Sequence, residues 1–516
     1  MAETKWNQYP DIPAEKFTLT QKDRKLFDQK LETKPIGYFK DAWLRFEKDK
    51  SAVVAFVLIL LLLMFSLIIP VFAPVDVSFR DGYYRKVLPK LPFMAGTGVW
   101  DGTSNQQETR AGYDYLNSIG VESGMGAVVK VNREFDDANG IHYYDMRVDS
   151  YNKVGYVYMN LSDAEYEALM DYQDEHSLQI IYPMPQTHRT DFVMANRGAN
   201  FWYKLKNDAS TTSGEAVYDE NGDYIPNYLT DSDRNKAGYR SLRIAGDDGG
   251  EDGSAWYVYA VKNQSGVKVR VNYYEYFRYK NHFEPVFYFG TNDYGQDIFT
   301  CLAIGGRLSF LLAFTVSIIN FIIGACYGAV EGYYGGAVDM VMERITDVLG
   351  YMPFIVVATL FNLHLQDKVG PLAALLFAFV LTGWISMAYR VRMQFYRFKG
   401  QEYVLAARTL GASDRRLIFK HIFPNSLGTI ITGSVLAIPG VIFSESMLSY
   451  LGIINLEASS ITSIGTMLAN GQGTLSTFPH IILFPALFIS ILEISFNLFG
   501  NGLRDAFNPS LRGADE

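Results

Sequence analysis

The chain contains six long apolar runs, and these runs restrict its possible folds more than any other feature. The first, 51–75, has no charged side chain and exceeds the roughly 20 residues that a helix needs to cross a bilayer. The five others are 301–330, 348–365, 369–389, 426–453 and 479–500. Hydrocarbon cannot hydrogen-bond to a backbone, so a spanning segment must satisfy its polar groups internally. The sequence therefore predicts an all-α polytopic membrane protein with six transmembrane helices in a lipid bilayer.

Basic residues predict the orientation of these helices. Four of them stand just before the first run: Lys40, Arg45, Lys48 and Lys50. Because cytoplasmic flanks are enriched in Lys and Arg, 1–50 is expected to be a cytoplasmic N-terminal segment and 51–75 the first transmembrane helix. A cleaved signal peptide is less favoured, since a long polar segment precedes the run. Six crossings then place 76–285 outside and 331–347 inside, with the C-terminus also cytoplasmic. The expected location is the plasma (cytoplasmic) membrane, crossed several times.

Residues 76–285 are polar, rich in Tyr, Asp, Gly and Asn, and have no run long enough to span a membrane. Alternating apolar positions predict strands at 127–131, 142–148, 178–182, 256–261 and 267–274. Ser162 and Glu165 form a capping-box pattern that opens a helix through about His176. Residues 263–266 predict a hairpin turn between the last two strands. We therefore expect an inserted extracytoplasmic α+β domain.

Composition excludes several kinds of chemistry. The net charge of −9 argues against nucleic acid as a partner. The sequence lacks a Walker A motif, an HExxH motif and zinc-type Cys/His spacing, so no catalytic, cofactor-binding or metal-binding residues are expected in this chain. Cys301 and Cys326 are interpreted as two membrane-buried thiols. Acidic pairs at 247–248 and 251–252 could bind calcium, but they lack the alternating ligands of a dedicated loop, which favours a solvated surface.

A charged, helix-forming segment, 402–425, lies between two of the apolar runs. Val404 and Ala407 share one small-residue face, and Gly411 follows them as the left-handed residue that can end a helix. Ser413 can then cap a second helix. The region is strongly basic: Arg390, Arg392, Arg397, Lys399, Arg408, Arg415, Arg416 and Lys420. The pattern predicts a helix, a tight turn and a helix, and without further context it is typical of a basic cytoplasmic loop.

Two acidic residues lie inside apolar runs. Glu445 and Glu493 are costly in hydrocarbon, so each is expected to face the bundle interior, a partner or water. They are candidate pathway or gating residues, and a structural pairing is an equal alternative. The spacing of Gly324 and Gly328 permits close approach of helices. Pro353 can break a span and create a cavity-lining kink.

These blocks resemble the permease family of binding-protein-dependent ABC importers, of the oligopeptide/dipeptide (and nickel) type, in the OppC/DppC-like subunit. Segment 402–425, with EYVLAARTLGAS followed by a basic helix that ends in HIFPN, is similar to the family's cytoplasmic EAA loop. Four further blocks agree in order: 289–297, 328–347, 445–452 and 496–509. Asn292 and Gln296 depart from the aspartate and arginine that are usual there. The insertion 76–285 is longer than the connection in many relatives.

The resemblance implies a type I ABC importer fold, with a permease core over 286–516 that includes a coupling loop at 390–425. It also implies that the chain is not an enzyme and that two ATP-binding subunits carry ATP and magnesium. A second permease subunit, OppB/DppB-like, and an extracytoplasmic substrate-binding protein that delivers a peptide substrate are the other implied partners. The implied ATPase-coupling residues are Glu402, Ala406, Ala407, Arg408, Gly411, Ala412, Ser413 and Asp414.

Other classes of protein stay open. A nickel or other small-solute ABC importer permease would share these motifs. A membrane-anchored sensor would explain the first span and the insertion, but it would not need five more spans. A secondary transporter should show an internal repeat and intramembrane charge pairs, which are not found. The insertion could dock the binding protein, guide substrate toward the pore or bridge to the companion permease.

Overall fold

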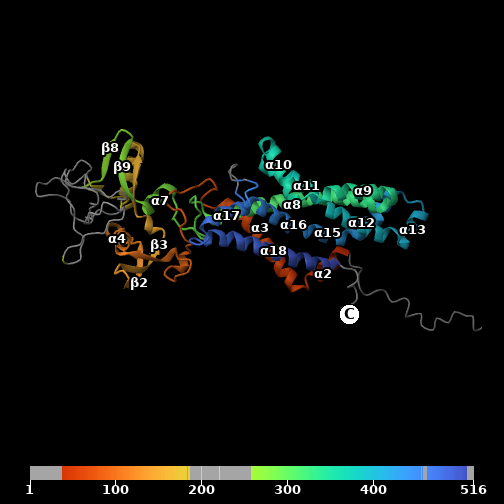
Figure 1. Ribbon diagram of the computed structural model, residues 1–516, viewed down its shortest axis with the longest axis horizontal. Helices are drawn as coiled ribbons and strands as arrows, with labels where there is room; N and C mark the ends of the chain where they lie inside the picture. The colour runs from red at the N-terminus through yellow and green to blue at the C-terminus, as the bar shows by residue number, and fades with distance from the viewer. Residues whose placement is uncertain are drawn as a thin grey trace, which may run out of the picture.

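The computed structural model describes residues 38–182, 184–185, 199, 220, 257–454, 456 and 462–507. Figure 1 shows two parts: a long helical bundle and, beyond one end of it, a region that contains all the labelled strands. We call the described residues between α3 and α8 the sheet domain. The predicted calcium-type acidic pairs at 247–248 and 251–252, and most of the loop around them, lie outside the described residues.

The bundle is built almost entirely from helices. In chain order they are α2 (Tyr38–Phe46), α3 (Lys50–Phe72), α8 (Ile298–Tyr334), α9 (Gly336–Gly350), α10 (Phe354–Val369), α11 (Pro371–Gly383), α12 (Ile385–Lys399), α13 (Glu402–Thr409), α14 (Asp414–Arg416), a π-helical stretch η5 (Leu417–Ile422), α15 (Phe423–Val435), α16 (Ala437–Tyr450), α17 (Ile464–Gly471), η7 (Gln472–Thr474) and α18 (His480–Phe507). The helical, polytopic fold class predicted from the apolar runs is confirmed.

Five of these helical segments are long and apolar enough to cross a membrane, within the described part of the chain. A sixth crossing results if α9 and α10 form one span, because the two helices meet at a bend of 73°. Pro353 is the N-cap of α10 and lies at this bend. The predicted run 348–365 includes this bend and continues along α10, so the kink predicted as possible at Pro353 is present. Residues 331–347, predicted to lie on the inner side, belong mainly to α8 and α9, and their side of the membrane stays a prediction.

Close contact between α8 and α12 forms one wall of the bundle. A Cβ at Gly328 would lie 2.1 Å from the carbonyl oxygen of Ala388, and one at Gly324 would lie 2.7 Å from the carbonyl oxygen of Trp384. Only glycine lets the two backbones approach so closely, as the predicted small-residue spacing requires. On another side, α3 and α18 lie together with α8, and Phe484, Phe488 and Leu492 of α18 join their shared apolar core.

The sheet domain contains two principal antiparallel sheets. Its strands are β1 (Thr103–Thr109), β2 (Val128–Asp136), β3 (His142–Asp149), β4 (Tyr156–Leu161), β5 (Ile181–Tyr182), β6 (Met184–Pro185), β7 (Tyr257–Val258), β8 (Ala260–Asn263) and β9 (Gly266–Asn272). The first sheet has the order β1-β3-β2, and the second has the order β4-β9-β5 with β8 also paired to β9. The short strands β6 and β7 pair with each other.

Helices cover these sheets: α4 (Arg110–Ser118), α5 (Gly120–Ser123), α6 (Asp163–His176) and α7 (Tyr273–Asn281), with 3-10 turns η3 (Pro92–Met94) and η4 (Asn152–Val154). The capping box of Ser162 and Glu165 opens α6 as predicted, and the β8–β9 hairpin turns at 263–266. The predicted strand 178–182 shrinks to β5, and 256–261 is divided between β7 and β8. Tyr273 and Tyr274, predicted to end a strand, begin α7. Strands β1 and β4 were not predicted.

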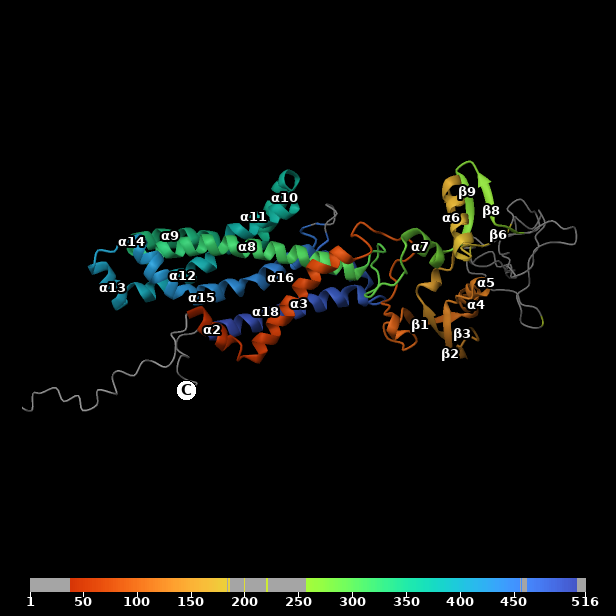
Figure 2. The same cartoon turned by 180° about the vertical axis from the view of Figure 1, so that it is seen from behind.

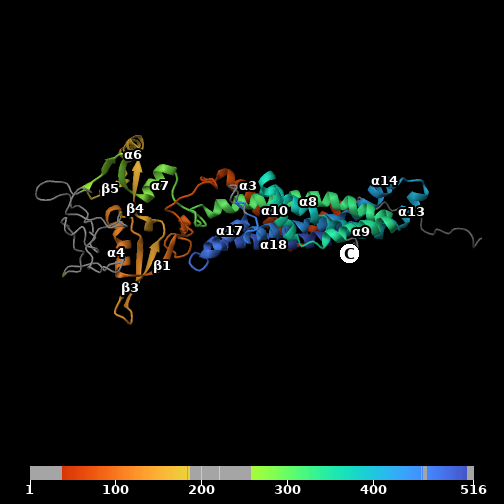
Figure 3. The same cartoon turned by 45° about the horizontal axis from the view of Figure 1, so that its top comes forward.

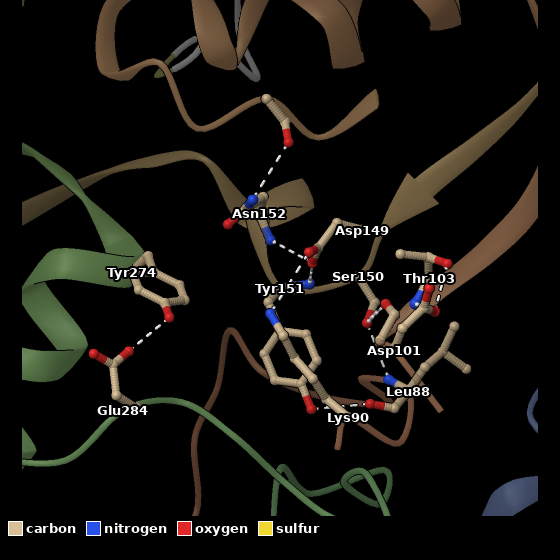
Figure 4. Close-up of polar contacts among 12 residues, drawn as sticks. Leu88, Lys90, Asp101, Thr103, Asp149, Ser150, Tyr151, Asn152, Tyr274 and Glu284 are labelled. Carbon is tan, nitrogen blue, oxygen red and sulfur yellow. Dashed lines mark hydrogen bonds and ion pairs between the residues drawn. The ribbon is translucent and has the colours of Figure 1, made fainter. Parts of the chain in front are cut away.

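A hydrogen-bonded junction holds the sheet domain to the chain that enters α8. The Tyr151 hydroxyl donates to the Leu88 carbonyl at 2.9 Å and accepts from the Phe287 N–H at 3.3 Å. Nearby, the Tyr274 hydroxyl donates to a Glu284 carboxylate oxygen at 2.6 Å (Figure 4). Because Tyr151 is fully buried, its two bonds lie where water cannot replace them. The strand-bearing part of the sheet domain is thus hydrogen-bonded to both of the segments that connect it with α3 and α8.

Candidate functional site

Segment 402–425 lies at the end of the bundle that is farthest from the sheet domain, as Figures 2 and 3 show for α13 and α14. It has the predicted helix, turn and helix. Helix α13 ends at Thr409, and Gly411 follows with a left-handed φ of +83°. The N–H groups of Leu410, Gly411 and Ala412 each donate to carbonyls within α13, which completes its C-terminal turn. The direction change at Gly411 therefore follows from local sequence.

The inner side of this segment packs on its own chain. Val404 has no exposed surface and lies in an apolar core with Val391, Phe395, Leu417 and Ile422. This core joins α13 to α12, η5 and the following helix. The short helix α13 is too short to be stable alone in water, so tertiary packing must hold it. Motion imposed on α13 would consequently be passed to the spans on both sides of it.

The segment also carries apolar side chains that none of the described residues covers. Leu410, directly before the turn, is 88% exposed. Tyr403 and Leu405 of α13 and Phe419 of η5 are also exposed. Isolated exposed apolar residues are common, but four of them on one short projecting segment are typical of a protein contact. This surface was not part of the predicted coupling set.

The predicted coupling residues divide between these two sides. Ala407 and Ala412 are partly buried, whereas Glu402, Ala406, Arg408, Gly411, Ser413 and Asp414 are exposed. Ser413 occupies the predicted N-cap position of α14 with an extended backbone, but its side chain makes no capping hydrogen bond. The backbone carbonyl of Ser413 accepts from the Leu417 N–H instead. The set is contiguous in space, and its role stays a prediction.

Tyr333, near the C-terminus of α8, braces the turn from the side. Its hydroxyl donates to an Asp414 carboxylate oxygen at 2.5 Å. The Arg408 guanidinium lies over the Tyr333 ring and reaches its hydroxyl at 3.5 Å. Tyr333 thus contacts the chain on both sides of the turn, because Arg408 precedes Gly411 and Asp414 follows it. No local pattern in the sequence marks Tyr333, which lies far from the segment along the chain.

Several cations that were predicted to decorate a loop belong to α12. The Arg392 guanidinium makes two hydrogen bonds to Asp339 of α9, at 2.6 and 2.8 Å, and two longer ones to Glu343. The Lys399 ammonium donates to the Gly332 carbonyl at the end of α8. A bidentate guanidinium–carboxylate pair fixes geometry as well as charge. These contacts fasten α8, α9 and α12 together just before the chain enters α13.

Glu445 lies deep inside the bundle, and only 1% of it is exposed. Its carboxylate accepts from the hydroxyls of Ser309 on α8 at 3.2 Å and of Ser446 and Ser449 on α16 at 3.3 and 3.1 Å. Helix α17 packs against the same place, where a Cβ at Gly465 would lie 2.4 Å from the Ser446 carbonyl oxygen. The expectation that Glu445 faces the interior agrees with this geometry. Its part in gating stays a prediction.

Glu493, on α18, is less enclosed than Glu445. It is partly buried, and its Oε1 atom has no hydrogen-bond partner among the described residues. Within the same part of the chain, no hydrogen bond or ion pair connects Glu493 with Glu445. The structure does not bring the two candidate gating residues into one polar cluster.

In the block 289–297, Asn292 and Gln296 stand where the family usually has charged residues, and their side chains form neutral hydrogen bonds. The Asn292 side-chain N–H donates to the side-chain Oε1 atom of Gln296 at 2.9 Å, and the Gln296 side-chain N–H donates to the Val77 backbone carbonyl at 2.6 Å. Thr291 accepts from the Val87 N–H and donates to the Tyr84 carbonyl. A neutral amide pair therefore ties the start of α8 to the chain that leaves α3.

Cys301 is buried and Cys326 is exposed, and neither forms a disulfide. Cys326 lies on the surface of α8, which is a candidate membrane span, so the prediction that both thiols are buried in the membrane stays a prediction. Among the described residues, no group of three or more His, Cys, Asp and Glu side chains has an arrangement that could hold a metal ion.

Two family profiles match the chain, and both describe membrane components of importers. Residues 320–513 match the binding-protein-dependent transport system inner membrane component, and residues 37–92 match the N-terminal transmembrane domain of oligopeptide transport permease C. The fold and these matches define a membrane permease of the binding-protein-dependent class. Neither match includes residues 93–319, which contain most of the sheet domain.

Relatives among the curated proteins include oligopeptide and dipeptide transport permeases. The chain is 41% identical over 225 residues to the oligopeptide transport system permease protein OppC of Bacillus subtilis (strain 168), a match that covers 44% of this chain and 72% of that protein. It is also 41% identical to the dipeptide transport system permease protein DppC of the same strain, with 44% and 69% covered. It is 35% identical to OppC of Escherichia coli (strain K12), with 44% and 73% covered. The chain belongs to this OppC/DppC family.

Among solved structures, the methionine ABC transporter MetNI in inward-facing conformations aligns with a TM-score of 0.33 and 15% sequence identity. That alignment covers 40% of this chain and 96% of the MetNI chain.

Proposed function

We propose that this chain is one of two permease subunits of an ATP-driven, binding-protein-dependent importer and forms half of the path by which oligopeptides or dipeptides cross the membrane. The observation that carries this proposal is segment 402–425, whose inner side is packed into the bundle while Leu410 stands 88% exposed beyond it. Such a segment suits contact with a second protein. Membership in the OppC/DppC family supports an ATP-binding subunit as that protein.

Segment 402–425 would act as the coupling element, through Glu402, Ala406, Ala407, Arg408, Gly411, Ala412, Ser413 and Asp414. An ATP-binding subunit that binds the exposed side of α13 would, when it moves, displace the apolar core around Val404. Tyr333 and Arg392 would carry that movement to α8, α9 and α12. A two-state change in these packed helices, driven by ATP binding in the partners, would alternate access to the path. ATP and magnesium would reside in the two partner subunits, and this chain would catalyse no reaction.

The proposed orientation places segment 402–425 and both chain termini in the cytoplasm and the sheet domain outside. The basic residues of α12 to η5 support this, because positive charge is retained on the cytoplasmic side. The ring of Phe39 contacts that of Phe507 at a centroid distance of 6.0 Å, so the described ends of the chain lie together. An even number of crossings, six with the bent α9–α10 pair, fits ends on one side.

We further propose that the division into 1–50, 51–75, 76–285 and 286–516 is functional. Residues 286–516 would form the permease core and pair with an OppB/DppB-like second permease. The sheet domain, in which Tyr151 is hydrogen-bonded to the segments that lead to α3 and α8, would dock the extracytoplasmic substrate-binding protein or line the entry to the path.

Affinity purification followed by transport tests the proposal. The tagged chain should retain two ATP-binding subunits and a second permease after solubilisation. Proteoliposomes of that assembly, supplied with the binding protein and ATP, should accumulate labelled dipeptides or oligopeptides. ATP-dependent accumulation of nickel ions without peptide uptake would instead support the nickel importer. Recovery of the chain without ATP-binding partners, together with no uptake of either solute, would overturn the proposal.

A further inference from the structure

Residues 91–100, LPFMAGTGVW, form a loop of the sheet domain that carries no charged side chain. We call it the apolar loop. Phe93, in the 3-10 turn η3, is 81% exposed, and Val99 and Trp100 are exposed as well. Isolated exposed apolar residues are common, but three large ones on one short uncharged loop mark a contact with a membrane or with another protein.

The neck of the apolar loop is closed and is fixed to the sheet domain. The Leu91 N–H donates to the Trp100 carbonyl at 2.7 Å, and Lys90 and Asp101 form a β-bridge just outside them. The Asp101 carboxylate accepts from the Arg147 guanidinium of β3 at 2.7 Å. A contact that holds the apolar loop in place therefore also holds β3.

Many polar groups of the apolar loop are paired within the loop itself. The N–H groups of Met94 and Thr97 donate to the carbonyls of Leu91 and Met94, at 2.9 and 3.1 Å. Apart from the indole of Trp100, Thr97 has the only polar side chain. Its hydroxyl donates to the Met94 carbonyl at 2.8 Å and accepts from the Val99 N–H at 3.3 Å. Unpaired backbone groups are costly in lipid, so this internal pairing suits a segment that leaves water.

The apolar loop lies beside one end of a membrane span. The ring centroids of Trp100 and Phe484 are 5.8 Å apart, and Phe484 is in the second turn of α18. The exposed charged residues Arg504 and Asp505 mark the other end of this helix. Phe484 and Arg504 are 20 positions apart, which corresponds to about 30 Å of helix at about 1.5 Å per residue.

This length equals the roughly 30 Å thickness of the hydrocarbon core of a bilayer. When the charges at the far end of α18 lie at one membrane surface, Phe484 and the Trp100 ring beside it lie at the other. Tryptophan is enriched at that depth, because its ring is apolar and its N–H can reach water or headgroups.

Lipid fits the apolar loop better than a protein partner does. A protein interface makes about one hydrogen bond per 100–200 Å², and the side chains of this loop offer one indole N–H and one hydroxyl that is already paired. The exposed apolar residues of α18 recur every three or four positions, on one face that begins beside Phe484: Leu483, Leu487, Ile491, Ile494 and Leu498. The exposed apolar surface of the span thus reaches the apolar loop.

We infer that the apolar loop is inserted into the membrane surface on the side where the sheet domain lies, with Phe93, Val99 and Trp100 among the lipid headgroups and the first acyl carbons. Interfacial segments bury their apolar side chains roughly 5–10 Å into this boundary. Because the neck of the loop is fixed to β3, the contact holds the sheet domain against the bilayer. The inference goes beyond the proposed function and does not depend on which solute is transported.

Collision measurements on a spin label test the inference. Cys301 and Cys326, the chain's only cysteines, are replaced by serine, and one cysteine is introduced by Phe93→Cys or, as a control, by Val129→Cys. Both positions are exposed in the sheet domain, so neither change disturbs a core. The full chain, with the subunits that copurify, is placed in vesicles of phosphatidylethanolamine and phosphatidylglycerol.

Each label is then exposed to oxygen, which concentrates in lipid, and to a chromium complex that stays in water. The ratio of oxygen collisions to chromium collisions should be at least about threefold higher at 93 than at 129. Equal ratios at the two positions would overturn the inference. A label at 93 that neither reagent reaches would mean that a protein covers the loop, which also overturns it.

A charged substitution provides an independent check. With the label attached through Val99→Cys, the further change Phe93→Asp should lower the ratio at 99 by at least about twofold, because a carboxylate is costly in lipid and draws the loop toward water. Ile141→Asp, at an exposed position next to β3, is the matched control and should leave the ratio unchanged. A ratio that Phe93→Asp does not lower, or that Ile141→Asp lowers equally, would contradict the lipid contact.

Discussion

Proline at position 411 should separate ATP hydrolysis from transport. Gly411 has a φ of +83°, whereas proline holds φ near −65°. Proline also lacks the N–H that Gly411 donates to the Arg408 carbonyl at 2.9 Å. The misplaced backbone and the lost hydrogen bond together cost roughly 2–4 kcal/mol at this turn. Alanine at 411 keeps the N–H and meets no atom within 4 Å, so it should cost only about 1–2 kcal/mol of backbone strain.

The damage should remain local. The apolar core around Val404 includes Val391 and Phe395 of α12 as well as Ala412 at the turn. We therefore expect α13 to stay attached to α12 while the exposed end of the turn changes direction. The assay measures ATP hydrolysed per peptide taken up, in proteoliposomes that contain the whole importer. Gly411→Ala should raise that ratio by less than about tenfold. Gly411→Pro should abolish uptake, leave ATPase activity measurable and leave the amount of chain in the membrane unchanged.

Gly370 supplies the control. It also has a left-handed φ, of +85°, and a Cβ placed there would likewise meet no atom within 4 Å. Its N–H also donates to a carbonyl, that of Gln366, but it lies between α10 and α11 and not in segment 402–425. Gly370→Pro should therefore impose similar backbone strain without the same uncoupling. Undiminished uptake in Gly411→Pro, or equal uncoupling in Gly370→Pro, would refute the reasoning.

Three further predictions concern other parts of the chain. Glu445→Gln keeps the size of the side chain that accepts from Ser309, so peptide uptake should fall more than the amount of chain inserted in the membrane. Transport assays measure the uptake and immunoblots measure the insertion. Equal loss of both would favour a structural role for Glu445. Burial raises the pKa of the Asp114 carboxyl to about 7, although Arg110 opposes this, so the free energy of unfolding should fall as pH rises from about 4 to 7. The melting temperature of Asp114→Asn should not show this dependence on pH. A variant whose melting temperature falls with pH as steeply as that of the wild type would contradict the prediction. Residues 104–148 contain a separate apolar core, and their flanking residues 103 and 149 are paired, so a two-residue turn can replace this part of the sheet domain. The affinity for the binding protein should then fall, while the ATP-binding subunits stay bound. Normal affinity and normal uptake would exclude docking at this part of the domain.

Local chemistry explains the parts of the fold that could be predicted. The turn at Gly411 and the capping box of Ser162 depend on residues a few positions apart, and both are present. The bend at Pro353 was predicted only as a possible kink, because the sequence cannot show whether a proline bends a span or divides it. The structure shows a break of 73° between α9 and α10, with Pro353 at the N-cap of α10.

Contacts between distant residues account for what could not be predicted. Tyr333 reaches Asp414 across 81 positions, and no local pattern marks a tyrosine at a helix end as a brace. Strand β1, TSNQQET, is too polar to show an apolar alternation, yet it pairs along its length with β3.

Photo-crosslinking from position 410 tests the central claim most directly, because it reports what touches segment 402–425. A photoreactive amino acid replaces Leu410, which is exposed, and separately replaces Val129 of β2, which is also exposed but lies in the sheet domain. In the assembled importer, the residue at 410 should crosslink to an ATP-binding subunit, and the residue at 129 should not. An active assembly in which 410 yields no such crosslink, or in which 129 does, would contradict the coupling role of this segment.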